Sequence, residues 1–82
     1  MTTLTLIGKP GCHLCDDARD IVTTVLTEFP DAALDELSIL DDEALRDRYA
    51  EEIPVLLIDG AVHTYWRVDA ERLRAALKTT AH

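Results

Sequence analysis

Two cysteines, Cys12 and Cys15, are the residues of this 82-residue chain whose types and spacing most directly suggest chemistry. They form a Cys-x-x-Cys motif in the segment Gly11-Cys12-His13-Leu14-Cys15. Residues three apart on a helix share one face, with Cβ atoms about 5–6 Å apart, so a small adjustment allows a disulfide. The motif therefore predicts thiol–disulfide exchange, with Cys12 as the attacking thiol and Cys15 as the resolving thiol.

The position of Cys12 favours its thiolate form. It falls at the start of a predicted helix, where free main-chain N–H groups and the positive end of the helix dipole stabilise an anion. Lys9 and a protonated His13 would add to this effect. Asp16 and Asp17 in the first turn would oppose it.

Thiol–disulfide exchange at this motif needs no metal or organic cofactor. The Cys12 thiolate attacks a substrate disulfide, and Cys15 then attacks the mixed disulfide and releases the reduced product. The protein is left oxidised, so another thiol system must reduce it.

Hydrophobic periodicity predicts four strands and three helices around this motif. The predicted strands are Thr3–Ile7, Leu34–Leu40, Val55–Ile58 and Ala61–Arg67, and the predicted helices are about His13–Glu28, Asp41–Ala50 and a last one capped by Asp69. Asp59-Gly60 predicts a two-residue hairpin turn. The order β-α-β-α-β-β-α predicts an α/β fold with a four-stranded mixed sheet flanked by helices. The length allows one domain, residues 1–82.

Composition argues against several classes of partner. The formal net charge is −8, from 16 acidic against 8 basic residues, and such a surface repels nucleic acid and anionic lipid. The longest apolar run, Val55–Ile58, is far too short to cross a bilayer. The N-terminus carries no signal-peptide pattern, so we expect a cytoplasmic location, where cysteines are kept reduced. We also expect a monomer.

Four segments resemble, in sequence and order, the glutaredoxin-like branch of the thioredoxin superfamily: Leu4–Ile7, Gly11–Cys15, Ile53-Pro54-Val55 and Asp59-Gly60. The resemblance covers nearly the whole chain, and a compact group of bacterial proteins shares the Cys-His-Leu-Cys motif. It implies a thioredoxin-like fold and disulfide oxidoreductase activity. It also implies that Pro54 is cis beside the redox motif, and that the main chain of Ile53 pairs with the substrate chain.

The departures from that family bear on the substrate. Lys9 matches the family lysine that meets a carboxylate of glutathione. The family's Gly-Gly-Asp, which holds the tripeptide, is replaced by the segment Tyr65–Asp69, in which only Asp69 remains as an anion or amine contact. The expected partner is therefore a disulfide-bearing protein or a small thiol, with glutathione itself in doubt. Thioredoxins also carry a buried acid six residues before the first cysteine, where this chain has Leu6.

The expected substrate-binding residues flank the two cysteines and the proline. They are Lys9, Gly11, His13, Leu14, Ile53, Pro54, Trp66 and Asp69. Trp66 either lines the groove beside Pro54 or covers an edge of the core.

Other interpretations of the cysteines remain. A structural zinc site needs four ligands, and the remaining histidines suited to it, His63 and His82, are single and distant in sequence, so we expect no metal. The cysteines could instead be inert core residues. The alternative function is a non-enzymatic thioredoxin-fold adaptor, or an iron–sulfur cluster scaffold that uses Cys12 and an external thiol.

Overall fold

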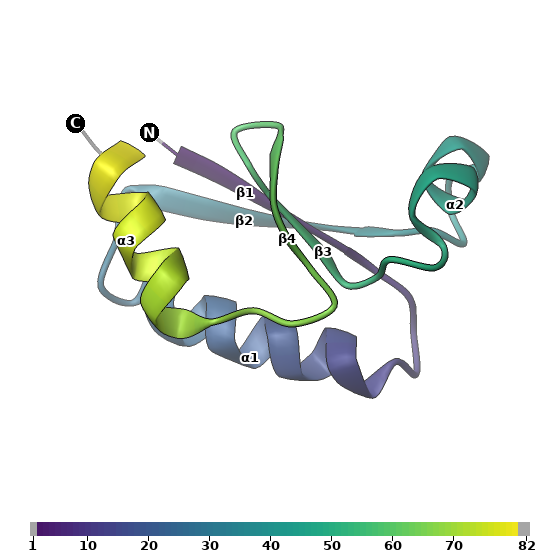
Figure 1. Cartoon of the computed structure of the whole chain (residues 1–82), viewed down its shortest axis with the longest axis horizontal. Helices are drawn as coiled ribbons and strands as arrows, with labels where there is room; N and C mark the ends of the chain where they lie inside the picture. The colour runs from purple at the N-terminus through teal and green to yellow at the C-terminus, as the bar shows by residue number, and fades with distance from the viewer. Residues whose placement is uncertain (1, 81–82) are drawn as a thin grey trace.

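The computed structural model describes residues 2–80 and contains seven elements in the predicted order (Figure 1). They are β1 (Thr2–Gly8), α1 (His13–Leu26), β2 (Ala32–Ser38), α2 (Glu43–Tyr49), β3 (Val55–Ile58), β4 (Ala61–Tyr65) and α3 (Ala70–Thr80). The predicted α/β fold, with a four-stranded mixed sheet flanked by helices, is confirmed.

The sheet has the strand order β2-β1-β3-β4, so β1 and β3 are central. β1 runs parallel to β2, with Leu4 opposite Leu34. β3 runs antiparallel to both of its neighbours, with Leu6 of β1 opposite Leu56. Because β1 and β2 are parallel, the chain between them must return along the sheet, and α1 makes that crossing.

The helices cover the sheet unequally. Figure 1 shows α1 and α3 side by side on one face of the sheet, whereas α2 lies at one end of the molecule. The main core lies between the sheet and the two helices α1 and α3. Its buried members are Leu4, Leu6, Ala18, Val22, Val25, Leu56, Val68, Leu73 and Leu77.

A second buried cluster contains Cys15, the cysteine predicted to act as the resolving thiol. Its members are Ile7, Cys15, Ile39, Tyr49, Ile53 and Val55, with Cys12, Leu45 and Leu57 packed against it. This cluster joins the start of α1 to the chain just before β3 and to the end of α2. The Cys-x-x-Cys motif is therefore anchored in its own small core.

Two strands end earlier than the sequence predicted. β2 ends at Ser38 instead of Leu40, because Asp42 caps α2 soon afterwards by accepting from the N–H groups of Ala44 and Leu45. β4 ends at Tyr65 instead of Arg67, because Trp66 adopts a left-handed conformation with φ +63°.

The hairpin turn between β3 and β4 is confirmed. Asp59 and Gly60 both have positive φ, at 49° and 86°, as a two-residue turn of this kind requires. Asp59 also accepts a hydrogen bond from the Thr3 N–H through its carboxylate at 2.9 Å, which fastens the turn to β1. Within residues 2–80, no helix has the length and apolar character needed to span a membrane.

Candidate active site

Cys12 caps α1 with its own sulfur. Its backbone is extended, with φ −92° and ψ 114°, and its Sγ accepts a hydrogen bond from the Cys15 N–H at 3.2 Å. The predicted position of Cys12 at the helix start is confirmed. The contact satisfies one of the main-chain N–H groups that open the helix. The side chain is partly exposed, so a substrate can reach it.

Cys15 lies beneath Cys12 and is only 2% exposed. Burial, followed by the hydrogen bond with Cys12, raises the pKa of Cys15 to about 11, while a hydrogen bond with the Lys9 main chain acts in the opposite direction. The two cysteines are thus unequal: the Cys12 sulfur is accessible, whereas the Cys15 sulfur is enclosed and has a raised pKa. This difference suits an attacking thiol and a resolving thiol.

Gly8 makes the enclosure of Cys15 possible. A Cβ placed on Gly8 would lie 2.8 Å from the Cys15 Sγ and 3.1 Å from its Cβ, closer than side chains pack. In the sequence, Gly8 stands only as the residue that follows the predicted strand Thr3–Ile7. No local pattern links it to a cysteine seven residues later, because the contact depends on how α1 folds back against β1.

The peptide bond between Ile53 and Pro54 is cis. Pro54 is buried, and Ile53 packs in the same cluster as both cysteines. Neither main-chain group of Ile53 has a hydrogen-bond partner within residues 2–80. The structure therefore places the unpaired main-chain groups of Ile53 beside the Cys-x-x-Cys motif.

Trp66 lies beside this proline. Its main-chain N–H donates to the Pro54 carbonyl at 2.8 Å, and its indole Nε1–H donates to the Glu51 carbonyl at 3.1 Å. The residue is 56% exposed, so it presents a ring to solvent and does not simply cover the core. A left-handed backbone is unusual for a tryptophan, and these two hydrogen bonds hold it there.

A groove of about 360 Å³ brings Trp66 together with Leu14 of the redox motif. We call it the Trp66 groove; it is lined by Leu14, Asp17, Ala18, Ile21, Trp66, Arg67 and Val68. Leu14 is 42% exposed, and the Tyr65 ring lies 6.4 Å from the Trp66 ring.

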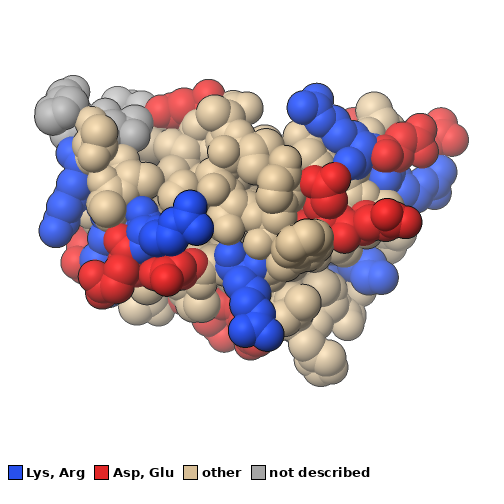
Figure 2. Space-filling view, in the orientation of Figure 1, with Lys and Arg blue, Asp and Glu red and all other residues tan. Residues whose placement is uncertain are grey.

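Figure 2 shows charged side chains gathered towards the two ends of the molecule, over α3 and α2, with a mainly uncharged middle over β3 and β4.

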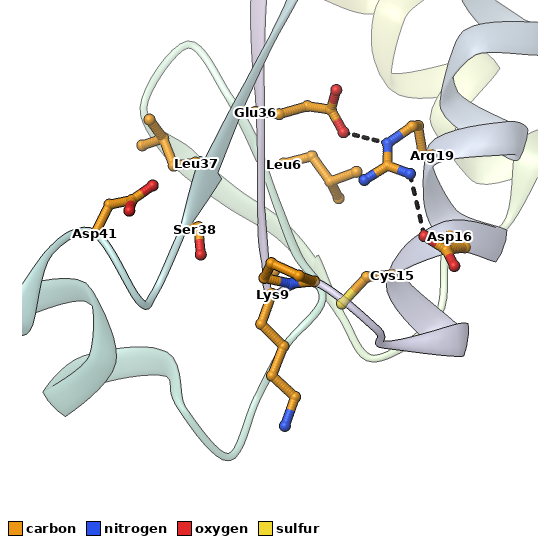
Figure 3. Close-up of a pocket in the computed structure, with 11 residues that line it drawn as sticks. Leu6, Lys9, Cys15, Asp16, Arg19, Glu36, Leu37, Ser38 and Asp41 are labelled. Carbon is orange, nitrogen blue, oxygen red and sulfur yellow. Dashed lines mark hydrogen bonds and ion pairs between the residues drawn. The ribbon is translucent and has the colours of Figure 1, made fainter.

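The remaining predicted site residues do not share this groove. Lys9 lines a separate cavity on another side of Cys15, and Figure 3 shows its side chain extending away from that sulfur. Asp69 lines a third cavity, where its carboxylate caps α3 by accepting from the N–H groups of Glu71 and Arg72. Gly11 and His13 are exposed beside Cys12, with Gly11 at φ +77°.

The structure offers no clustered metal ligands in the part of the chain that it describes. Within residues 2–80, no three His, Cys, Asp or Glu side chains come together as a metal site would require. His63 lines the third cavity with Asp69, where burial and then Arg72 lower its pKa. His82, the other histidine considered for zinc, lies outside the described residues.

Comparison with known proteins agrees with this geometry. The profile of the glutaredoxin-like domain family (DUF836) matches residues 3–78. The chain belongs to this glutaredoxin-like family. An uncharacterized protein of Mycobacterium tuberculosis is 32% identical over 77 residues, which cover 85% of this chain and 76% of that protein. A glutaredoxin-like protein of Dictyostelium discoideum is 29% identical over 76 residues, covering 87% and 70% of the two chains.

Solved structures place this glutaredoxin-like domain in the thioredoxin fold. The structural-genomics target protein XcR50 from X. campestris is 36% identical and superposes with a TM-score of 0.70, covering 93% of this chain and 96% of its own. A mutant thioredoxin from Halobacterium salinarum has a TM-score of 0.73 at 22% identity, covering 99% of this chain and 75% of its own. That similarity shows the fold alone. A glutaredoxin-like, thioredoxin-fold domain with this cysteine pair is compatible with redox activity.

We predict that Gly8→Ala destabilises the fold by about 1–3 kcal/mol, because the added methyl group overpacks the Cys15 site. Urea unfolding measures the loss. In a Cys15→Ala background the cost should fall, since the Sγ that the methyl group meets at 2.8 Å is gone. An equal cost in both backgrounds would show that Cys15 is not the residue that requires glycine here.

Proposed function

We propose that this protein is a thiol–disulfide oxidoreductase that reduces disulfides through Cys12 and Cys15. The observation that supports this most strongly is the arrangement of the pair at the start of α1. Cys12 is partly exposed and accepts a main-chain hydrogen bond, whereas Cys15 is buried directly beneath it. The family match and the Ile53–Pro54 backbone beside the pair add support.

The proposed reaction has two exchange steps. The Cys12 thiolate attacks one sulfur of the substrate disulfide, forms a Cys12–substrate disulfide and expels the other sulfur as a thiolate. Cys15 then loses its proton and attacks the Cys12 sulfur, which releases the second substrate thiolate and leaves a Cys12–Cys15 disulfide. Two electrons pass to the substrate, and an external dithiol or two small thiols must return them. Cys12 and Cys15 are the only protein groups that the two exchange steps require.

We propose that the substrate chain lies along Ile53 and into the Trp66 groove. An extended segment beside the cysteine under attack would pair with the unpaired main-chain groups of Ile53. An apolar side chain of that segment would rest on Trp66 and Leu14, which are fixed and exposed. Gly11 and His13 flank the attacked sulfur. Lys9 and Asp69 line other cavities, so we assign them no contact with this segment.

This arrangement favours a disulfide-bearing protein over glutathione as the substrate. Where the resemblance would put the Gly-Gly-Asp that holds the tripeptide, this chain has Tyr65–Asp69, and the Trp66 N–H bonds to the Pro54 carbonyl. The acidic surface would disfavour nucleic acid and anionic lipid. We propose a cytoplasmic location and a monomeric protein, consistent with a reductase that meets many partners.

Cys12→Ser should abolish turnover of a disulfide-bonded protein such as insulin, because no other exposed thiol can begin the exchange. Cys15→Ser should instead accumulate a covalent adduct between Cys12 and the substrate, because nothing resolves the mixed disulfide. Mass spectrometry of the quenched reaction measures the adduct. Equal, partial losses in both variants would contradict these roles, and a coloured, iron-containing protein would favour a cluster scaffold.

Trp66→Ala should raise the KM for a protein disulfide about tenfold or more, because it removes an exposed aromatic anchor beside the redox pair. Trp66→Phe keeps a ring and should stay within about threefold of the wild type. Leu40→Ala, an equally exposed apolar position between β2 and α2, serves as the control and should leave KM unchanged. An unchanged KM in Trp66→Ala would remove the groove from the substrate path.

A further inference from the structure

A cavity of about 460 Å³ reaches Cys15 and shares no lining residue with the Trp66 groove. We call it the Cys15 cavity; it is lined by Leu6, Gly8, Lys9, Pro10, Cys15, Asp16, Arg19, Glu36, Leu37, Ser38 and Asp41. Figure 3 shows the Cys15 sulfur at its wall, between the turn that follows β1 and the first turn of α1. The resolving thiol, although 2% exposed, therefore borders a polar space.

One arginine on that wall forms ion pairs with two carboxylates. Arg19 donates from Nη1 to the Asp16 carboxylate at 3.1 Å and from Nε to the Glu36 carboxylate of β2 (Figure 3). Asp16 directly follows Cys15 in the chain, so its charge is the one closest in sequence to the buried thiol. Its negative charge helps to raise the pKa of Cys15, after burial and the contacts with Cys12.

The other groups around Cys15 add little net charge. Leu6 is apolar, Tyr49 packs in the same buried cluster, and Cys12 is the neighbouring sulfur. Lys9 and Asp41 lie on the cavity wall with opposite charges. Arg19 pairs with both Asp16 and Glu36, and a guanidinium in that position opposes the field of the carboxylates that it contacts.

We propose that Asp16 and Arg19 are positioning residues that set how readily Cys15 gives up its proton in the resolving step. The negative charge of Asp16 destabilises the Cys15 thiolate. The positive charge of Arg19 reduces this destabilisation, because Arg19 forms an ion pair with Asp16. The balance matters because Cys15 must be ionised to attack Cys12, while its proton leaves to water in the cavity. The proposal rests on the proposed function, since it concerns the second exchange step of the same cysteine pair.

The test follows that step with 5,5′-dithiobis(2-nitrobenzoate). Cys12 attacks the reagent, releases one thionitrobenzoate and keeps the other as a mixed disulfide. Cys15 then attacks the Cys12 sulfur and releases the second thionitrobenzoate, which stopped-flow absorbance records as a separate phase. The rate of that phase, measured against pH, reports the ionisation of Cys15 without requiring the natural substrate.

Asp16→Asn should speed the second phase about two- to fivefold at neutral pH and move its pH profile to lower pH. Arg19→Gln should slow it by a similar factor and move the profile to higher pH, because Asp16 and Glu36 then act unopposed. Both effects should shrink in about 1 M salt, since the three side chains are roughly half exposed. The opposite signs are the decisive feature.

Both substitutions break the same ion pair, so a purely structural role would change the rate in the same direction. The matched control is Arg74→Gln, which breaks a similar arrangement of one arginine between Glu28 and Glu71 on α3, away from the cavity. It should leave the second phase unchanged. Changes of the same sign, or no change, would overturn the proposal, whereas the absence of a second phase in the wild type would overturn the proposed function itself.

Discussion

The hydrogen bond from the Cys15 N–H to the Cys12 sulfur is the contact on which the rest of the site depends. A helix begins with main-chain N–H groups that need acceptors, and here a cysteine supplies one. The same bond therefore starts α1 and directs the Cys12 sulfur towards Cys15. In the proposed function the residue that caps the helix is also the attacking thiol, so the start of α1 positions the reacting sulfur.

The two thiols differ in burial. Gly8 leaves room for Cys15 against β1, and the cluster with Ile53 closes over it. Cys12, at the edge of this cluster, keeps access to solvent. An 82-residue domain has few buried positions available, yet one complete cluster surrounds this pair. Part of a small core thus encloses Cys15, whose pKa is raised by burial, while Cys12 at its edge stays accessible.

Most of the fold could be predicted because its signals are local. Asp59-Gly60 marks a turn that needs positive φ at both residues, and Cys12 follows a turn that leads into a helix with regular apolar spacing. The edge strand β2 is less well marked because its exposed positions alternate weakly, and its predicted range was displaced by two residues.

The parts of the site that the sequence does not reveal depend on contacts between distant elements. Gly8 is required by a side chain on α1, and Arg19 reaches Glu36 across to β2, 17 residues later. The exposed orientation of the Trp66 side chain depends on hydrogen bonds to the Pro54 and Glu51 carbonyls. These carbonyls approach Trp66 only after the chain has folded. Such contacts leave no periodic pattern in the sequence.

The most direct test is a redox titration of the Cys12/Cys15 pair in dithiothreitol buffers of known ratio, with free thiols trapped and the protein weighed. A catalytic dithiol predicts a reversible loss of two hydrogens, with a reduction potential between roughly −180 and −270 mV. A potential below roughly −300 mV would indicate a structural disulfide instead. If no intramolecular disulfide forms at any ratio, the two cysteines do not act as an exchange pair.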